Sequence, residues 1–235
     1  MGHDETHPVS RTSPRWEDPR TVAGFTTSGP NQVLLAFARQ YLGGARPPAC
    51  LDLGCGAARN ALPLARLGLR VTGTDLSAPM LDAARARMHQ DGAPVQLVLA
   101  PMTPLPFGDA TFDLVVAHGI WNLARSSSEF RGALAEAARV ARPGAGLFLF
   151  TFSRRTLPPA AQPVAGESFV FSCWNGEPQC FLTQEEVVGE LAAAGFVRAA
   201  PGPLTEYNAP RPGEIRAGGP PVIWEGTFVR SGAGG

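Results

Sequence analysis

From about residue 31 onward, short apolar runs alternate with longer stretches in which apolar residues recur at helical spacing. Ala-, Leu- and Arg-rich stretches predict helices at Ala57–Leu67, Pro79–Gln90 and Glu129–Arg139. The apolar runs have the length of strands, and we expect strands at Cys50–Leu53, Val71–Asp75, Val95–Ala100, Phe112–His118 and Gly146–Phe152. This alternation is typical of βαβ units, so the pattern predicts an α/β fold in which helices cover both faces of a largely parallel sheet.

The region after the last of these strands is expected to close the sheet. A Pro-rich connection and the aromatic patch "SFVFSCWNG" precede a helix that Thr183 can cap. Beyond it, Phe196–Tyr207 and Val222–Arg230 alternate like paired strands, which completes a seven-stranded sheet within a domain of residues 31–230. The last residues, 231–235, read "SGAGG" and are predicted to be disordered.

Composition narrows the choice of partner and compartment. Twenty basic residues, all arginine, balance 20 acidic ones, so no long-range field favours nucleic acid or an anionic membrane. No apolar run approaches the roughly 18 residues of a membrane span, and we expect a cytoplasmic protein. The four cysteines lack the spacing of a zinc site, so we expect no metal and mostly reduced thiols, although Cys173 and Cys180 could form a disulfide.

The stretch "LDLGCGAARN" places Gly54 and Gly56 between a strand and a helix, where a ligand can approach the backbone closely. Arg59 replaces the third glycine of a dinucleotide site, which argues against a bound pyrophosphate. Asp75 ends the next strand and can accept hydrogen bonds from ribose hydroxyls. Asp52, inside the first strand, would repel phosphate but suits an ammonium or sulfonium. A nucleoside with a cation and no phosphate describes S-adenosylmethionine.

Five segments in order carry a family resemblance: "LDLGCGAARN", "GTDLS", "PLPFGDATFDLVVAHGI", "ARVARPGAGLFLF" and "LTQEEVVGELAAAGF". Together they resemble the successive motifs of class I S-adenosylmethionine-dependent methyltransferases. The resemblance implies a Rossmann-like, seven-stranded, mostly parallel sheet with helices on both faces and a reversed terminal strand. "GAARN", with Arg59 and Asn60, and the later "FLTQEEV" are similar to the tellurite-resistance and thiopurine-type small-molecule subgroup.

The resemblance also implies a set of cofactor-binding residues. Gly54 and Gly56 would line the methionine part, and Leu76 would form an apolar wall for adenine. Pro101 stands where the family usually has an acidic residue that binds the adenine amino group, so adenine recognition falls on Met102. The full expected set is Asp52, Gly54, Gly56, Asn60, Asp75, Leu76, Pro101, Met102 and His118.

The motif "HGIWN" follows the fourth predicted strand and should lie at the carboxyl edge of the sheet, where ligands bind. We expect a pocket with His118 near the methionine end of the cofactor and Trp121 or Asn122 toward the acceptor, which makes these three the candidate catalytic residues. The alternative is that His118 hydrogen-bonds to backbone while Trp121 fills the core under the following helix.

Trp16 and Phe25 lie in an otherwise polar N-terminal stretch, "RWEDPRTVAGF". It resembles the lid that small-molecule methyltransferases fold over cofactor and substrate, and we expect such a lid over residues 1–30. The alternative is simple packing on the sheet edge.

These observations predict a methyltransferase that moves a methyl group from S-adenosylmethionine to a small-molecule acceptor by in-line displacement. The absence of a [DNS]-P-P-[YFW] motif after the fourth strand, and of a basic face, argues against nucleic acid as the acceptor. Two alternatives are a nicotinamide-dependent oxidoreductase and a non-catalytic cofactor-binding protein on the same fold. The acceptor, the atom that is methylated and the oligomeric state stay open at this point.

Overall fold

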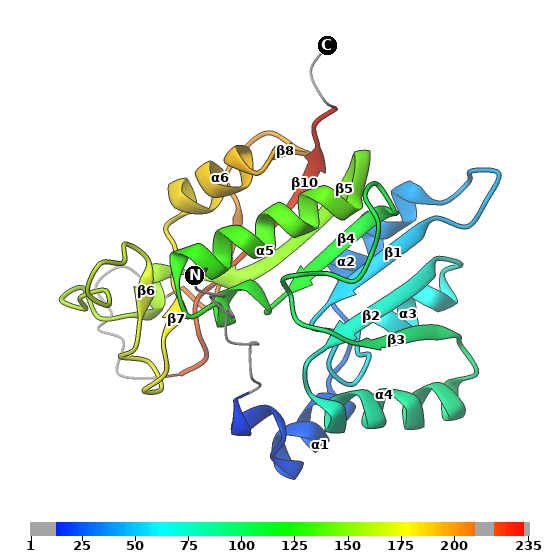
Figure 1. Cartoon of the computed structure of the whole chain (residues 1–235), viewed down its shortest axis with the longest axis horizontal. Helices are drawn as coiled ribbons and strands as arrows, with labels where there is room; N and C mark the ends of the chain where they lie inside the picture. The colour runs from blue at the N-terminus through cyan, green and yellow to red at the C-terminus, as the bar shows by residue number, and fades with distance from the viewer. Residues whose placement is uncertain (1–12, 210–218, 233–235) are drawn as a thin grey trace, which may run out of the picture.

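A computed structural model describes residues 13–209 and 219–232, which are built around one mostly parallel sheet (Figure 1). The strands follow the order β3-β2-β1-β4-β5-β10-β8, and β9 pairs with the same β10. β10 runs antiparallel to β5, so the expected Rossmann-like sheet with a reversed strand is confirmed. The strands are β1 Ala49–Leu53, β2 Arg70–Asp75, β3 Val95–Leu99, β4 Phe112–His118, β5 Ala141–Phe152, β8 Phe196–Arg198, β9 Thr205–Tyr207 and β10 Ile223–Arg230.

Helices pack on both faces of the sheet, as predicted. They are α1 Pro19–Thr27, α2 Gln32–Ala38, α3 Ala61–Arg66, α4 Ala78–Asp91, α5 Ser127–Val140 and α6 Gln184–Ala193. Neighbouring strand residues point to opposite faces. Leu51 therefore joins the cluster formed with α5 and α6, while Cys50 joins the cluster formed with α2 and α3. All five residues of β1, Asp52 included, are buried, because that strand lies in the middle of a sheet covered on both sides.

The first predicted helix begins later than expected. Its first residues form a turn, in which Gly56 and Ala58 have φ angles of 52° and 59°, and α3 starts only at Ala61. Left-handed φ values cannot continue into a right-handed helix, so the strand connects to α3 through a wide loop. This loop leaves room at the carboxyl end of β1.

The C-terminal region differs from the expectation in two places. The predicted strand Phe196–Tyr207 is split into β8 and β9, which pair with the two ends of β10 on the same edge. Pro201 and Pro203 lie in the interruption, where proline cannot donate to a ladder. A second, two-stranded sheet of β6 Val170–Phe171 and β7 Gln179–Cys180, which the sequence did not predict, lies between β5 and α6. Thr183 caps α6 through a capping box with Glu186, as expected.

Short 3₁₀ helices complete the described elements: η1 Pro14–Trp16, η2 Arg39–Tyr41, η3 Trp121–Leu123 and η4 Arg154–Thr156. The four cysteines are free thiols, with Cys173 exposed and Cys180 buried. Ser231 donates a hydrogen bond to the Gly195 carbonyl at 2.8 Å, and residues 233–235 of the tail predicted to be disordered lie outside the described part. Among the described helices, none has the length and apolar character needed to cross a membrane.

Candidate active site

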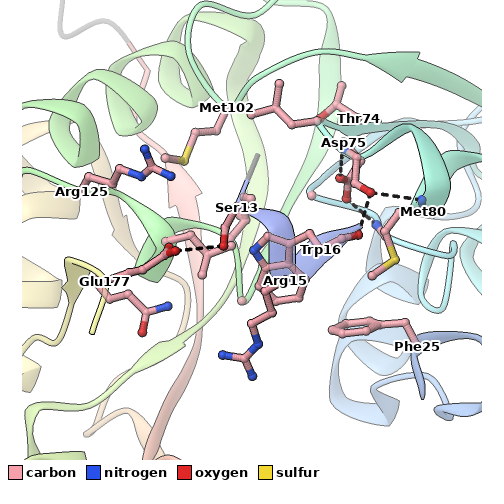
Figure 2. A pocket seen from close by; sticks show the side chains of 18 of the residues that line it. Ser13, Arg15, Trp16, Phe25, Thr74, Asp75, Met80, Met102, Arg125 and Glu177 are labelled. Carbon is pink, nitrogen blue, oxygen red and sulfur yellow. Dashed lines mark hydrogen bonds between the residues drawn. The ribbon is translucent and has the colours of Figure 1, made fainter. Parts of the chain in front are cut away.

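A cavity of about 370 Å³ opens at the carboxyl edge of the parallel strands (Figure 2). This volume lies within the range of small-molecule sites. Its walls come from five parts of the chain. They are the turn after β1 with the end of β2, the segment after β3, the segment after β4, the N-terminal segment before α2, and the connection between β6 and β7. The position is the one expected from the strand order, because β1 and β4 are neighbours and their connections leave in opposite directions.

Two glycines give the turn after β1 its shape. Gly54 has a φ of 63°, and a Cβ there would lie 2.7 Å from Ile120 Cδ1, so this position admits only glycine. Gly56 has a φ of 52°, and its nearest neighbours at an added Cβ would be Phe25 at 3.6 Å and Met80 at 3.9 Å. Both glycines line the cavity, where bare backbone lets a ligand come close.

Asp75 is fixed on the wall of the cavity at the end of β2. Its Oδ2 accepts a hydrogen bond from the Gly56 N–H at 2.9 Å, and its Oδ1 accepts one from the Ser77 N–H at 2.8 Å (Figure 2). Burial raises the pKa of this carboxyl, while the backbone donors Ser77, Gly56 and Leu76 lower it. Each carboxylate oxygen has a second lone pair, so Asp75 can still accept hydrogen bonds from a ligand.

The other residues expected to hold the cofactor divide into two groups. Leu76 and Met102 line the cavity, whereas Pro101 does not and its neighbour Ala100 does. Asn60 is buried, and its Oδ1 accepts a hydrogen bond from the Asn31 N–H at 3.0 Å. In this structure Asn60 therefore secures the chain before α2 and does not reach the cavity.

Asp52 lies behind the glycine turn with 2% of its surface exposed, and it does not line the cavity. Its Oδ2 has no hydrogen-bond partner among the described residues. Burial raises the pKa of Asp52 to about 7, with Arg59 lowering it and Asp75 raising it further. A buried carboxyl with an unpaired oxygen is stabilised in its ionised form by a nearby cation.

His118 ends β4, lines the cavity and stacks on Phe150 with ring centroids 4.1 Å apart. Arg59 Nη2 lies 3.1 Å from His118 Nδ1, and since a guanidinium only donates, Nδ1 is the acceptor. A neutral ring whose Nδ1 accepts carries its proton on Nε2, so Asn31 Nδ2, which is also a donor, approaches Nε2 at 3.3 Å without making a hydrogen bond to it. Burial and, after it, the charge of Arg59 lower the pKa of His118 to about 3, so the imidazole is neutral near pH 7. The hydrogen bond to Arg59 shows that a side chain, and not only backbone, orients the ring.

Asn31 lies beside His118 and is hydrogen-bonded to β10, the reversed strand. Its Nδ2 donates to Glu225 Oε2 at 2.6 Å, and Tyr207 donates to Glu225 Oε1 at 2.7 Å. Glu225 belongs to β10 and is 3% exposed. These hydrogen bonds tie Asn31, at the start of α2, to the reversed strand.

Trp121 and Asn122 are each 1% exposed and lie in η3, outside the lining of the cavity. Trp121 packs against Phe130 of α5 with ring centroids 6.5 Å apart, which is the core position weighed as the alternative. Ile120 and Leu123, on either side of them, line the cavity instead. Trp121 Nε1 and Asn122 Oδ1 have no hydrogen-bond partner within residues 13–209 and 219–232.

The N-terminal segment extends across the cavity. Ser13, Trp16 and Phe25 line it, and the Trp16 and Phe25 rings meet edge to face with centroids 5.7 Å apart. Ser77 Oγ donates to the Trp16 carbonyl at 2.8 Å, which fastens the segment to the end of β2. Ser13 Oγ donates to Glu177 Oε1 at 3.1 Å, which joins it to the connection between β6 and β7 (Figure 2). Residues 1–12 of the expected lid lie outside the described part.

Sequence reasoning missed the wall formed by the connection between β6 and β7. Asn175, Glu177 and Gln179 line the cavity there, although they are far in sequence from both glycines. The aromatic patch just before them was a visible signal, because a cluster of aromatic residues in a loop region has to pack on something. The described residues contain no group of three His, Cys, Asp or Glu suited to holding a metal ion.

Comparisons with known proteins agree with this geometry. Residues 51–149 match the protein family described as "Methyltransferase domain". The chain is 32% identical to a demethylmenaquinone methyltransferase of Corynebacterium urealyticum, over 77% of this chain and 87% of that protein. The chain belongs to the class I S-adenosylmethionine-dependent methyltransferases. A ubiquinone biosynthesis O-methyltransferase of Methylobacterium sp. is 29% identical over 77% of this methyltransferase and 83% of that protein.

A solved structure shares the fold of the methyltransferase. It is the 1,6-didemethyltoxoflavin-N1-methyltransferase of Burkholderia thailandensis with bound 1,6-didemethyltoxoflavin and S-adenosylhomocysteine. It has a TM-score of 0.63 and 20% sequence identity, and the match covers 92% of this chain and 81% of that chain.

The residues of the methyltransferase fit its cofactor, S-adenosylmethionine. Asp75 offers carboxylate oxygens where ribose hydroxyls could donate, and the two turn glycines leave backbone open to the ligand. The unpaired Oδ2 of Asp52 lies in a strand that leads into that turn, where a positively charged ligand would offset a buried negative charge. No phosphate-binding arrangement is needed for such a ligand.

Proposed function

We propose that this methyltransferase methylates a small, ring-bearing acceptor that binds between the glycine turn and the connection between β6 and β7. The observation that carries this proposal is a cavity that has the glycine turn and Asp75 on one wall, the connection between β6 and β7 on another, and an N-terminal segment fastened across it. Trp16, Phe25, Ile120 and Leu123 give the cavity an apolar lining suited to a flat molecule. The names of the relatives, which refer to quinone biosynthesis, support an acceptor of this kind.

The cofactor supplies an electrophilic methyl group on a sulfonium, and the protein holds the cofactor and the acceptor in place. We propose that Asp75 binds the ribose, that Leu76 and Met102 contact adenine, and that Gly54 and Gly56 accommodate the methionine part. Asp52 balances the positive charge from behind the turn. Pro101 and Asn60 act through the backbone around them, because neither lines the cavity.

We propose that His118 positions the reactants and is not a general base. Its Nδ1 is engaged by Arg59 and its pKa is far below neutrality, so it has little tendency to take a proton. Displacement at a sulfonium depends mainly on alignment and exclusion of water, which a stacked, neutral ring and the covering Trp16 and Phe25 can provide. A phenolic acceptor would then lose its proton to solvent before the transfer and react as the phenolate. Trp121 and Asn122 support this wall from beneath.

The remaining expectations stay proposals. The cavity is lined by residues of both charges, including Arg15 and Glu177, which favours a small molecule over nucleic acid. Free thiols at all four cysteines fit a cytoplasmic location. The likeness to the tellurite-resistance and thiopurine-type subgroup stays a prediction.

The test is a turnover assay with S-adenosylmethionine and a panel of hydroxylated aromatic compounds, in which S-adenosylhomocysteine formation is measured. We expect turnover with at least one phenolic member, and thermal stabilisation by S-adenosylhomocysteine but not by NAD⁺. Stabilisation by NAD⁺ alone would support the oxidoreductase alternative. Cofactor binding without turnover of any acceptor would support a non-catalytic binding protein.

A further inference from the structure

Ser77, between β2 and α4, hydrogen-bonds to three different parts of the chain. Its N–H donates to Asp75 Oδ1 at 2.8 Å, and its Oγ accepts from the Met80 N–H at 3.2 Å. The same Oγ donates to the Trp16 carbonyl at 2.8 Å. Ser77 is 1% exposed, so water does not compete for these bonds. One buried residue therefore joins the end of β2, the start of α4 and the N-terminal segment that crosses the cavity (Figure 2).

The N-terminal segment rests on the helix that Ser77 caps. α1 packs against α4, and Phe25 of α1 and Met80 of α4 both line the cavity next to Gly56. The Trp16 ring, whose backbone carbonyl Ser77 holds, meets the Phe25 ring edge to face. The position of both rings over the cavity therefore depends on the conformation of the chain at the start of α4.

We propose that Ser77 couples the cofactor to the N-terminal segment, so that binding of ribose at Asp75 holds Trp16 and Phe25 over the cavity. This inference rests on the proposed role of Asp75. A carboxylate that accepts from ribose hydroxyls is held in one orientation, and the Ser77 N–H that donates to it is held with it. The fixed backbone of Ser77 then directs its hydroxyl at the Trp16 carbonyl. Ser77 is thus a positioning residue that acts through its two neighbours.

This coupling gives the two ligands an order of binding. The N-terminal segment forms part of the cavity proposed for the acceptor, so closure that depends on the cofactor completes the acceptor site only after the cofactor has bound. The coupling is also reciprocal, because a cofactor that favours the closed segment is bound more tightly when the segment is closed. Closure around a bound cofactor excludes water from the sulfonium before the acceptor arrives.

The experiment measures hydrogen–deuterium exchange of the backbone amides in residues 13–27 of the full chain, with and without saturating S-adenosylhomocysteine. We expect the ligand to slow this exchange about 5-fold in the wild type. In Ser77→Ala the slowing should fall to about 2-fold or less, because the hydrogen bond to the Trp16 carbonyl is lost while the rings remain. By reciprocity, calorimetry should show that the affinity for S-adenosylhomocysteine falls about 2- to 3-fold in Ser77→Ala.

Ser126→Ala is the matched control. Ser126 Oγ accepts from the Glu129 N–H at 3.0 Å and caps α5, which has 14 residues, as α4 does. The variant therefore loses a helix cap of the same kind, at a residue that does not line the cavity. It should keep the slowing of exchange that the wild type shows in residues 13–27.

Several outcomes would overturn the inference. If S-adenosylhomocysteine binds the wild type without slowing the exchange, or slows it equally in Ser77→Ala, the cofactor does not act on the segment through Ser77. An equal loss in Ser126→Ala would mean that any weakened helix cap has this effect. If Ser77→Ala does not fold, Ser77→Gly removes the same hydroxyl with a residue tolerated at an N-cap, and failure of both to fold would make Ser77 a structural residue. A wild type that does not bind S-adenosylhomocysteine would instead overturn the proposed function, so the two failures are distinguishable.

Discussion

The two walls of the cavity are built in different ways. The wall proposed to bind the cofactor, here named the cofactor wall, comes mainly from one short stretch, in which β1, the glycine turn and the end of β2 follow each other closely. The wall proposed to bind the acceptor, here named the acceptor wall, comes from three distant segments, around Trp16, around Leu123 and around Gln179. The first is held by backbone geometry and by the hydrogen bonds of Asp75, the second by contacts between segments such as Ser13 with Glu177.

This difference indicates which parts of the chain can change in sequence without disturbing the fold. The cofactor is common to the family, so a local arrangement of glycines and carboxylates suffices to bind it. The acceptor wall can change its side chains without disturbing the sheet, because its residues lie on loops and on a small added hairpin. Apart from changes at Ser77, which contacts both Asp75 and Trp16, a change in one wall should therefore affect one ligand and spare the other.

The largest effect is expected from the carboxylate at the end of β2. Asp75→Ala should weaken binding of S-adenosylmethionine and S-adenosylhomocysteine by about 1.5 to 3 kcal/mol, through loss of charge-assisted hydrogen bonds to ribose. Calorimetry measures this change. Because Asp75 also holds Gly56 and Ser77, the melting temperature must be followed in parallel. A folded Asp75→Ala protein with unchanged affinity would remove the ribose assignment.

The next effect concerns the segment across the cavity. Removing residues 1–28 should leave a folded core and lower turnover by on the order of 10-fold or more, because Trp16 and Phe25 no longer exclude water or hold the acceptor. Affinity for S-adenosylhomocysteine should change less. Full activity in the shortened protein would mean that the segment only packs on the surface.

A smaller effect is expected from His118. His118→Ala should lower the rate by about 10-fold while affecting cofactor affinity less, since the ring positions ligands. Because the pKa of His118 in the folded protein is about 3, the pH–rate profile of the wild type should show no inflection near pH 6.5, and His118→Ala should have a profile of the same shape. An inflection near neutrality that disappears in His118→Ala would restore the role of general base.

His118 also makes a prediction for stability. Its folded pKa lies below the value of 6.5 for a free histidine, so the unfolded chain binds more protons in that range. Its contribution to stability is complete above about pH 6.5 and is lost as pH falls toward 3. Urea denaturation between pH 4 and 7 should thus show a shallower pH dependence for His118→Phe than for the wild type.

The smallest effect belongs to Asp52. Its pKa is raised from 3.8 to about 7, so the folded protein binds the extra proton between these values and the free energy of unfolding falls as pH rises through this range. A cationic ligand favours the ionised form, so affinity for S-adenosylmethionine should rise a few-fold between pH 6 and 8. Asp52→Asn should abolish both dependences. If the affinity for S-adenosylmethionine still rises with pH in Asp52→Asn, another titrating group causes the rise.

The sequence was sufficient for most of the sheet and for placing the glycine turn and Asp75 at its carboxyl edge, while their role in cofactor binding stays a prediction. Local patterns revealed β1 to β5, α6 and the positions of Gly54 and Asp75, because each depends on residues close in the chain. They placed the start of α3 too early, since left-handed φ at Ala58 is not visible in an alanine. The sequence also could not show that Trp121 is buried in the core while Gln179 lines the cavity, because both positions depend on how β7 packs against η3.

The most direct test of this division is a calorimetric titration of S-adenosylhomocysteine into the wild type, Asp75→Asn and Gln179→Leu. Asp75→Asn keeps the shape of the side chain but removes its charge, and it should weaken binding by several-fold or more. Gln179→Leu should bind S-adenosylhomocysteine as tightly as the wild type, because it belongs to the acceptor wall. An Asp75→Asn protein with wild-type affinity, or a Gln179→Leu protein with a similarly large loss, would contradict the separation of the two walls.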